Sequence, residues 1–403
     1  MSDPWLTIIG IGEDGVAGLS AASQAALTEA EVIMGPQRHL DLVVNTALTT
    51  SVPAGTDLIP WPVPFADGIA ILASLRGKRV AVLASGDPFW FGAGSVIARS
   101  FGPGEWSALP GPSCFSLATA HLGWPIEDTT CLALHAAPIA RLRAHLAPGA
   151  RLITTLRDGA AVHDLTAYLI AQGFGDSMVT VLEHLGGPQE RITTAEANAH
   201  SGAFDHPVCA ALHIAGDGPV LSAASGQSDD TFASDGQITK RPIRAITLST
   251  LAPKPGEHLW DVGGGSGSIA LEWLLAHPTT RATCIEPRAD RAARIQSNAA
   301  ALGVEHRVTV IEGAAPDALT GLKIPDAIFV GGGLSDPVLT AVTAINARIV
   351  VNAVTLEGEA LLTKFYAQMG GELMRIALSQ ATPLGPKRGW TSAYPVVQWS
   401  LAR

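Results

Sequence analysis

Short apolar runs, each closed by a turn, alternate with helix-like patterns along the whole chain. In the first half, residues 5–12 and 31–35 predict buried strands on either side of a helical stretch at 16–31. Residues 52–65 contain four prolines and are predicted to be irregular. Later apolar runs predict further strands: KRVAVLAS, WSALP, ARLITTLRD, SMVTVLEHLG and HPVCAALHIAG. This alternation indicates an α/β architecture.

The second half repeats the alternation with strands of its own. Four strands and two helices are predicted, the strands at 258–262, 281–286, 307–311 and 325–330, and the helices at 267–276 and 289–302. The run ARIVVNAV and two late segments, 372–379 and 393–400, complete the set of strands. We therefore expect a second open α/β sheet with its own core.

Residues 221–236 interrupt the pattern, because LSAASGQSDDTFASDG is dominated by Ser, Asp, Gly and Ala. A chain of 403 residues also exceeds the usual size of a single core. We therefore predict one domain at 1–220, a linker at 221–236 and a second domain at 237–403.

Composition narrows the class of protein and its partners. Hydrophobic residues make up 47% and charged residues 15%, which is typical of a soluble, well-packed α/β protein. The net charge is −10 and no basic tract occurs, so no nucleic-acid partner is expected. No apolar run approaches about 18 residues, and the N-terminus lacks the features of a signal peptide. We expect a cytoplasmic protein with no membrane partner.

The four cysteines, Cys114, Cys131, Cys209 and Cys284, show no metal-ligand spacing. They are expected to be buried, reduced thiols of an intracellular protein. No GxSxG nucleophile motif and no metal-binding box occurs elsewhere, so no metal is predicted.

The stretch LWDVGGGSGSIALEW joins an apolar strand to a helix through a glycine-rich turn, which is typical of a nucleotide site. Gly263, Gly265 and Gly267 follow Asp261 in the order DxGxGxG. A dinucleotide fingerprint needs its third glycine at position 268, which is Ser268, so a nicotinamide cofactor is disfavoured. The pattern instead matches the first motif of class I methyltransferases. We expect the glycines to let the backbone approach the ligand, since a Cβ would block it.

An acid at the end of the next predicted strand supports an adenosine ligand. Glu286 lies about twenty residues after the glycines, where a carboxylate accepts hydrogen bonds from both ribose hydroxyls. Nicotinamide enzymes share this feature, so it identifies the ribose and not the reaction. The stretches VIEGAAPDAL and IFVGGG end the next two strands, where this fold contacts adenine and substrate.

Both halves resemble known methyltransferase families. Four segments are similar to those of decarboxylating precorrin C15-methyltransferases: GQITKRPIRAITLSTL, VGGGSGS, EGAAPDA and VNAVTLE. The words IIGIGEDG, GPQRHL, LASGDPFWFGAG and PGPSC resemble the tetrapyrrole methyltransferases. Together the halves resemble the fused precorrin-6Y C5,15-methyltransferases of cobalamin biosynthesis. The resemblance implies a two-lobed tetrapyrrole methyltransferase fold followed by a class I, Rossmann-like sheet.

The resemblance also implies two S-adenosylmethionine sites on one chain. In the second half, that site falls on Thr239, Gly263, Gly264, Gly265, Ser266, Gly267, Glu286 and Ala315. In the first half, it falls on Glu13, Ser85, Gly86, Asp87, Trp90, Ser113, Cys114 and Leu156. The implied reactions are methylation of precorrin-6Y at C5 by the first half, and at C15 by the second half with decarboxylation of the C12 acetate.

A precorrin carries many carboxylates, so its site requires cations. The candidates come from three clusters: Arg38 and His39; Lys240, Arg241 and Arg244; and Lys387 and Arg388. Decarboxylation requires a proton donor beside the macrocycle. Glu357 and Asn352 are candidates for that wall, although an acid favoured by the dipole at a helix N-terminus is the preferred explanation of Glu357.

Other functions remain open at this point. A class I methyltransferase acting on RNA, protein or another tetrapyrrole, a nicotinamide oxidoreductase, and a non-enzymatic S-adenosylmethionine sensor share parts of the pattern. The acidic balance and the lack of an output module weigh against the first and the last. A homo-oligomer is expected by analogy with the families resembled.

Overall fold

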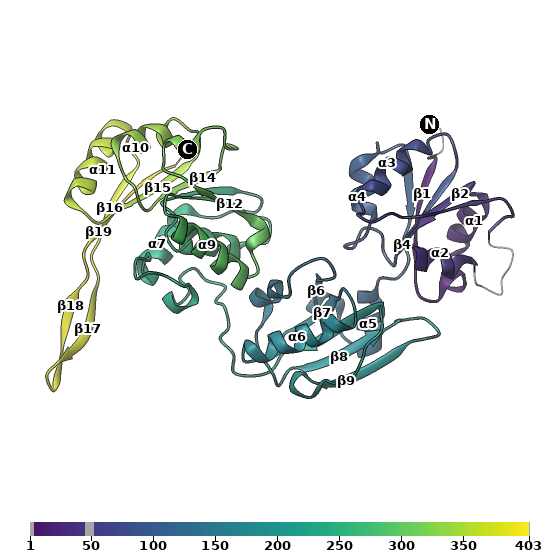
Figure 1. Ribbon diagram of the computed structural model, residues 1–403. Helices are drawn as coiled ribbons and strands as arrows, with labels where there is room; N and C mark the ends of the chain where they lie inside the picture. Colours follow the sequence, from purple (N-terminus) through teal and green to yellow (C-terminus); the bar gives the residue numbers. More distant parts are fainter. Residues whose placement is uncertain (1–3, 45–51, 403) are drawn as a thin grey trace. The chain divides into compact units, whose positions relative to one another are not determined.

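The computed structural model describes residues 4–44 and 52–402. Contacts divide the chain into two compact units, Met1–Ile139 with His145–Pro219, and Ala140–Ala144 with Val220–Arg403 (Figure 1). The segment expected as a linker, 221–236, is grouped with the second unit. No helix in the described residues has the length and apolar character that a bilayer span requires.

The first unit begins with a parallel sheet in the order β3-β2-β4-β1-β5. Its strands are β1 (Leu6–Ile11), β2 (Val32–Gly35), β3 (Asp57–Pro60), β4 (Val80–Ser85) and β5 (Trp106–Leu109). The helices of this lobe are α1 (Ala21–Glu29), α2 (Gln37–Val44), α3 (Asp67–Ser74) and α4 (Gly94–Ser100). Alternate strand residues enter separate cores on the two faces, for example Ile9 and Ile8. Burial on both faces explains why these strands are continuous apolar runs.

The prediction that residues 52–65 are irregular is wrong in part, because β3 lies within them. β3 is an edge strand that pairs only with β2 among the described strands. An edge strand tolerates proline, since a missing N–H there interrupts no second ladder. Pro60 ends the strand, so the prolines limit β3 to four residues without abolishing it.

The second lobe of the first unit is a mixed sheet in the order β6-β7-β10-β8-β9. Its strands are β6 (Thr130–Ala133), β7 (Arg151–Thr155), β8 (Met178–Glu183), β9 (Arg191–Glu196) and β10 (Val208–His213). Only β6 and β7 pair in parallel; the other pairs are antiparallel. The helices are α5 (Cys114–Leu122) and α6 (Ala160–Ala171). Strands β6 and β9 were missed in the sequence, since both are short or exposed along their length.

The second unit contains a seven-stranded sheet in the order β13-β12-β11-β14-β15-β19-β16. The strands are β11 (His258–Val262), β12 (Arg281–Glu286), β13 (Val308–Glu312), β14 (Ala327–Val330), β15 (Arg348–Ala353), β16 (Glu372–Ile376) and β19 (Val396–Leu401). β11 lies between β12 and β14, so the chain reverses its direction of travel across the sheet there. Ligands of open α/β sheets bind at this point. The predicted strands and the α/β class are confirmed.

Helices cover both faces of this sheet. On one face lie α7 (Arg241–Leu251), α8 (Ser268–Ala276) and α9 (Ala289–Ala301). On the other lie α10 (Asp336–Thr343) and α11 (Leu356–Met369). Each face has its own apolar core, with Trp273 fully buried in one and Trp399 in the other.

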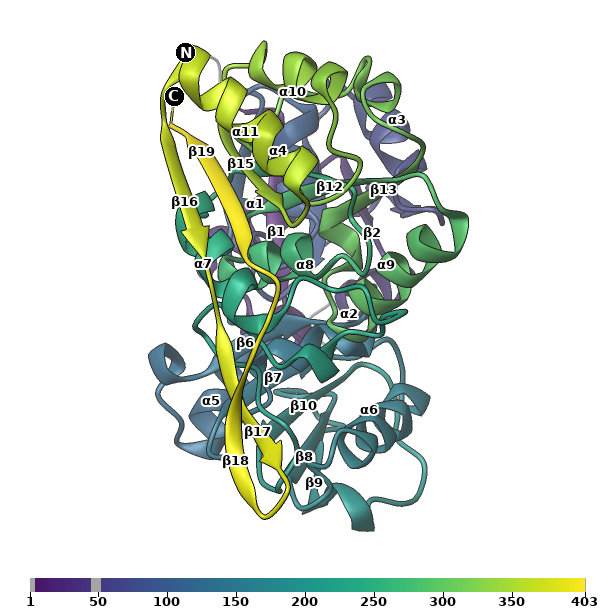
Figure 2. The same ribbon diagram turned by 90° about the vertical axis from the view of Figure 1, so that its left-hand side faces the viewer.

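A long hairpin leaves the sheet of the second unit between β16 and β19. It consists of β17 (Ser379–Leu384) and β18 (Lys387–Ser392), which pair only with each other among the described strands. Figures 1 and 2 both show it projecting from the end of the sheet. The sequence did not predict this hairpin, because its residues are mostly exposed and do not alternate.

Candidate functional site

The glycine-rich turn after β11 requires backbone in the left-handed, positive-φ region. Gly263, Gly265 and Gly267 have φ angles of +76°, +58° and +77°. Residues with a side chain adopt such angles only at a cost, so glycine is required at each position for conformation alone.

Packing adds a second requirement at two of these glycines. A Cβ on Gly263 would lie 2.6 Å from the backbone of Gly332, and one on Gly267 would lie 2.9 Å from Ile295. A Cβ on Gly265 would meet nothing closer than 3.9 Å. Approach of a ligand was expected to explain all three glycines. That explanation still applies to Gly265, where the space is free. At Gly263 and Gly267 the space that a Cβ would occupy is taken by other atoms of the protein.

Glu286 ends β12 beside this turn and is only 3% exposed. Its Oε2 accepts a hydrogen bond from the Gly265 N–H at 2.8 Å, and its Oε1 accepts one from the Arg288 N–H at 3.1 Å. Each carboxylate oxygen has two lone pairs, so each keeps one for a further donor. The carboxylate is thus held in place and can still accept two hydroxyl groups.

A cavity of about 190 Å³ opens at the same edge of the sheet. Its lining includes three predicted residues, Gly263, Glu286 and Ala315, and also Gly332 and Gly333 after β14. Arg288 and Arg291 line it too. These arginines were not predicted from the sequence, although they lie directly after the acid expected to bind ribose.

Asp261 lies beneath the turn and is completely enclosed. Its Oδ2 accepts from the Ala270 N–H at 3.2 Å, while its Oδ1 has no partner among the described residues. Burial, with a smaller contribution from the charge of Glu286, raises the pKa of the Asp261 carboxyl to about 7. Asp261 is not in the cavity lining, but Val262 and Gly263 directly after it are. A buried carboxylate so near in the chain would be stabilised by a ligand that carries a positive amine. The residues present therefore fit a ligand with a ribose and an ammonium group.

Thr239 and the basic residues near it lie on the chain that leads into α7. The Arg244 guanidinium has no exposed surface and binds Glu272, Asp229 and the carbonyl of Thr239. The expected role of Arg244 in binding substrate is therefore wrong: it fastens the segment before α7 to α8. Lys240 and Arg241 are exposed, and Lys240 pairs with Asp229 at 3.6 Å.

The third basic cluster lies elsewhere. Lys387 and Arg388 are in β18, and the projecting hairpin carries them away from the cavity beside Glu286 (Figure 2). Within one chain, the structure does not bring this predicted pair to the site. A larger cavity, about 270 Å³, lies between residues 222–227, α7 and α8, and none of the predicted residues line it.

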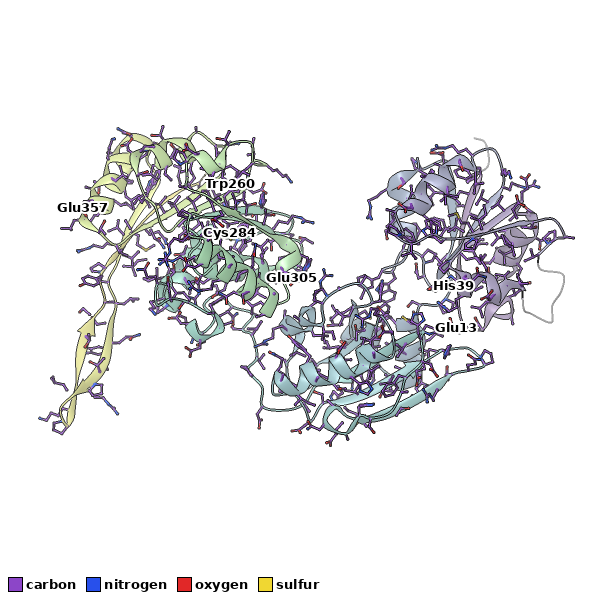
Figure 3. All side chains as sticks on the ribbon, in the orientation of Figure 1. Glu13, His39, Trp260, Cys284, Glu305 and Glu357 are labelled. Carbon is purple, nitrogen blue, oxygen red and sulfur yellow. The ribbon has the colours of Figure 1, made fainter. Side chains whose placement is uncertain are left out.

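The two candidates for decarboxylation are in different surroundings. Asn352 on β15 donates to the Thr247 hydroxyl at 2.9 Å and accepts from Gln398 at 2.9 Å, so both ends of its amide serve the fold. Glu357 is exposed in the first turn of α11 (Figure 3), where the helix dipole favours an acid. A Cβ on Gly358 in the first turn of α11 would lie 3.4 Å from the Leu334 side chain, and Leu334 follows Gly333 of the cavity lining.

The first unit has a candidate site where three strand-end loops meet. A Cβ on Gly10 would lie 1.9 Å from the Gly86 carbonyl oxygen and 2.4 Å from the Gly111 nitrogen. Two hydrogen bonds tie the loops together: Gly86 N–H to the Ile11 carbonyl at 3.0 Å, and Gly111 N–H to the Gly86 carbonyl at 3.1 Å. Gly86 also has a φ of +54°.

Most of the other residues predicted for this unit lie on the same loops or directly after them. The Asp87 carboxylate accepts from the Phe89 N–H at 2.8 Å, and Ser113 caps α5 by accepting from the Ser116 N–H at 3.1 Å. Trp90 packs on Phe115 with ring centroids 5.0 Å apart, and Cys114 is the first residue of α5. Leu156 is 3% exposed and donates its N–H to Val208, so its side chain belongs to the core.

Glu13, Arg38, His39 and Ser85 form one polar network in this unit. Arg38 pairs with Glu13 and donates to His39 Nε2 at 2.9 Å; Ser85 Oγ lies 3.0 Å from the same nitrogen. Figure 3 shows Glu13 and His39 close together. Burial, followed by the charge of Arg38, lowers the pKa of the His39 imidazole to about 3. His39 is therefore neutral and is not the cation that was expected.

The network has a further member that the sequence analysis missed. His184, which follows β8, lies 3.5 Å from Glu13 through Nδ1. The two residues are 171 positions apart, so no local pattern could have connected them.

The sequence matches two family models, one in each unit. Residues 5–199 match the family described as tetrapyrrole (corrin/porphyrin) methylases, and residues 230–403 match a precorrin methyltransferase domain.

Proteins similar over the full length share one name. A precorrin-6Y C(5,15)-methyltransferase [decarboxylating] from Sinorhizobium sp is 48% identical over 99% of this chain and 97% of its own. A protein of the same name from Mycobacterium tuberculosis is 38% identical over 99% of this chain and 100% of its own. A crystal structure of the C-terminal domain of precorrin-6Y C5,15-methyltransferase from Rhodobacter capsulatus is 49% identical, with a TM-score of 0.44, over 45% of this chain and 100% of its own.

The two reasons for glycine predict different costs of substitution. Gly265→Ala should lower the free energy of unfolding by about 1–2 kcal/mol, the cost of a left-handed residue with a side chain. Gly263→Ala should cost a further ~1–3 kcal/mol, because its Cβ also meets the Gly332 backbone. Urea unfolding of the two variants measures the difference. Equal losses would show that the contact with Gly332 relaxes freely.

The raised pKa of Asp261 predicts how stability changes with pH. An unfolded aspartate has a pKa of about 3.9, so between pH 4 and 7 the folded state holds a proton that the unfolded state has lost. This term therefore favours folding at pH 4 and fades as the pH rises through 7. We expect Asp261→Asn to gain about 2–4 kcal/mol relative to the natural chain between pH 4.5 and pH 8 in urea unfolding. Parallel curves for the two proteins would contradict the shift.

Proposed function

The chain belongs to the family of decarboxylating precorrin-6Y C5,15-methyltransferases, and on that premise we propose that each of its units holds one S-adenosylmethionine. The chain is a methyltransferase of cobalamin biosynthesis with decarboxylase activity, and its substrate is a precorrin. The observation that carries the proposal is the presence of two unlike glycine-rich strand ends on one chain. In the first unit, Gly10, Gly86 and Gly111 meet where β1, β4 and β5 end, and in the second unit a cavity opens where β11 and β12 end.

We assign one methylation to each unit. The second unit would methylate C15 and remove the C12 acetate carboxyl, because residues 230–403 match the precorrin methyltransferase domain. The first unit would methylate C5, because residues 5–199 match the tetrapyrrole methylases. The combined product would be precorrin-8.

S-adenosylmethionine, when bound, supplies a methyl group on a sulfonium that an electron-rich ring carbon can attack directly. The protein then needs to position the two partners and exclude water, and needs no side-chain nucleophile. In the second unit, Glu286 would accept the ribose hydroxyls and Asp261 would balance the ammonium group. Because Gly265 has no side chain, the space above it is free for the ribose and the ammonium group.

In the first unit, Gly86, Asp87 and Ser113 would form the corresponding donor site. Arg38 is the cation best placed for a substrate carboxylate, since its side chain is 31% exposed and Ser85 and His39 orient its guanidinium. A neutral His39 leaves the positive charge on Arg38 alone. For decarboxylation, Glu357 is the candidate proton donor, because α11 starts beside the loop that lines the second cleft.

The hairpin supports assembly of several chains. Two strands alone are marginally stable in water, yet this hairpin exposes Trp390 by 78%, Leu384 by 69% and, just after it, Tyr394 by 88%. Apolar side chains on an uncovered two-stranded sheet suit a partner surface. We propose that hairpins of neighbouring copies cover one another in a homo-oligomer.

One variant in each unit tests the division of labour in the full-length chain. Glu286→Gln removes the charge that holds the ribose and should weaken one of two S-adenosylhomocysteine sites in calorimetry by about 10–100-fold. With precorrin-6Y and labelled methyl donor, this variant should add the C5 methyl and release little CO₂. Asp87→Ala should show the reverse: C15 methylation with decarboxylation, and no C5 methyl. Loss of both methyls in both variants, or a single binding site in the natural chain, would contradict two independent sites.

The proton donor is tested in the same assay. Glu357→Gln should keep C15 methylation and slow the release of CO₂ by about 10²-fold or more, as expected when a general acid is lost. Unchanged CO₂ release would remove Glu357 from the mechanism and leave it as an acid favoured by the helix dipole.

The hairpin is tested through the mass of the protein in solution. Trp390→Ser combined with Leu384→Ser should convert an oligomer to single chains in analytical ultracentrifugation. Ile324→Ser is the matched control, because Ile324 is also 69% exposed but lies outside the hairpin; it should leave the mass unchanged. A natural chain that sediments as a monomer, or a double variant that still associates, would contradict the proposal.

A further inference from the structure

Residues 233–237, here called the strap, form neither helix nor strand but are closely tied to the second unit. They follow Phe232, which is buried in the core under α8 and α9. Within the strap, the Gln237 N–H donates to the Asp235 carboxylate at 3.2 Å. A segment whose composition indicates a linker is thus fixed in one place.

One buried amide joins the strap to the glycine-rich turn. Asn298 on α9 is 4% exposed; its Oδ1 accepts from the Ala233 N–H at 2.9 Å, and its Nδ2 donates to the Ala233 carbonyl at 3.0 Å. The same Nδ2 also donates to the carbonyl of Ser266 at 2.9 Å. Asn298 therefore sets the distance between the strap and the turn.

Two arginines on the same face of α9 hold the other end of the strap. Arg291, Arg294 and Asn298 have the i, i+3, i+7 spacing that places side chains along one side of a helix. Arg291 donates to the Asp235 carboxylate at 2.9 Å and to the Gln237 side-chain oxygen at 2.7 Å. Arg294 lies 3.6 Å from the same carboxylate.

These contacts bring a strap carbonyl to the open side of the turn. The Gln237 carbonyl oxygen lies 3.9 Å from the position that a Cβ of residue 265 would occupy, and the Gly263 carbonyl oxygen lies 4.0 Å from it. Two acceptors thus lie at the edge of the free space above Gly265. Carbonyl oxygens around a small space suit a group that donates several hydrogen bonds, such as an ammonium.

We propose that the strap is a wall of the methyl-donor site of the second unit, and that Asp235, Arg291 and Asn298 are positioning residues that hold the Gln237 carbonyl toward the methionine ammonium. This inference rests on the proposed donor site beside Glu286. Asp235 and Asn298 are not in the cavity lining and act through the strap, whereas Arg291 lines the cavity as well as holding the strap. Their effect is on the binding of the donor to this unit and not on the first unit or on the transfer step.

The test uses full-length variants and separates the two methylations. Asp235→Asn keeps the size of the side chain and its acceptor for Gln237, and removes the charge that Arg291, Arg294 and, at 3.9 Å, Arg288 share. Arg291→Gln removes the other partner. Glu372→Gln is the control, because Glu372 is an exposed acid of the same unit on β16, the edge strand farthest from β12 and β13. KM for the methyl donor and kcat are measured for the C15 and C5 transfers separately.

We expect Asp235→Asn and Arg291→Gln each to raise the donor KM of the C15 transfer about tenfold, with kcat changed less than twofold. Both parameters of the C5 transfer should stay within twofold, as should all parameters of Glu372→Gln. The double variant should be no worse than the more severe single one, because the two residues act as one contact. In the natural chain, saturating S-adenosylhomocysteine should slow hydrogen exchange of the 233–237 backbone.

Several outcomes would overturn the inference. An unchanged C15 donor KM in both single variants would show that the strap contributes nothing to the donor site. A fall in kcat alone, or equal losses in both transfers, would assign the residues to general folding. These results differ from failure of the proposed donor site itself, for which Glu286→Gln would also leave the C15 donor KM unchanged.

Discussion

In each unit, strand-end loops approach so closely that no Cβ fits between them. Gly10, Gly86 and Gly111 meet in the first unit, and Gly263 meets Gly332 in the second. This close contact between backbones places peptide N–H and carbonyl groups at the carboxyl edge of the sheet. Unlike the polar atoms of a side chain, these groups cannot rotate away. These contacts fix the positions of four polar residues, Ser85, Asp87, Asp261 and Glu286. Each lies within two residues of the end of a strand that makes one of the contacts or pairs with a strand that does.

The second cleft adds an electrostatic constraint. Asp261 and Glu286 are both buried near one turn, and their mutual repulsion contributes to the raised pKa of Asp261. Two acids so close are unfavourable in the protein alone and become favourable beside a cation. The same logic explains why the strap matters. The strap lies on the side of the turn where carbonyl oxygens add partial negative charge. Two arginines of α9 hold it there, and the Asp235 carboxylate balances their positive charge.

The sequence predicted the sheet of the second unit nearly strand by strand, because buried parallel strands are continuous apolar runs. The predictions failed where the role of a residue depends on its tertiary surroundings and not on its type. Arg244 is a basic residue in a promising cluster, but only tertiary structure reveals that Glu272, Asp229 and two carbonyls enclose it. His39 was chosen as a cation, which its burial does not allow, and both ends of the Asn352 amide bond to other side chains of the fold. The strap was read as a linker because Ser, Asp and Gly form loops whether or not something holds them.

The charge balance of the chain also takes on a different meaning. A net charge of −10 would repel a polycarboxylate at long range, but salt screens that repulsion beyond about 8 Å. Within that distance, two of the cations near the proposed sites have an acid partner: Arg38 has Glu13, and Lys240 has Asp229. A substrate carboxylate that takes the place of such an acid exchanges one ion pair for another, so little desolvation is added. Ion pairs at the sites can therefore select an anionic substrate through exchange, and a cluster of free positive charge is not needed.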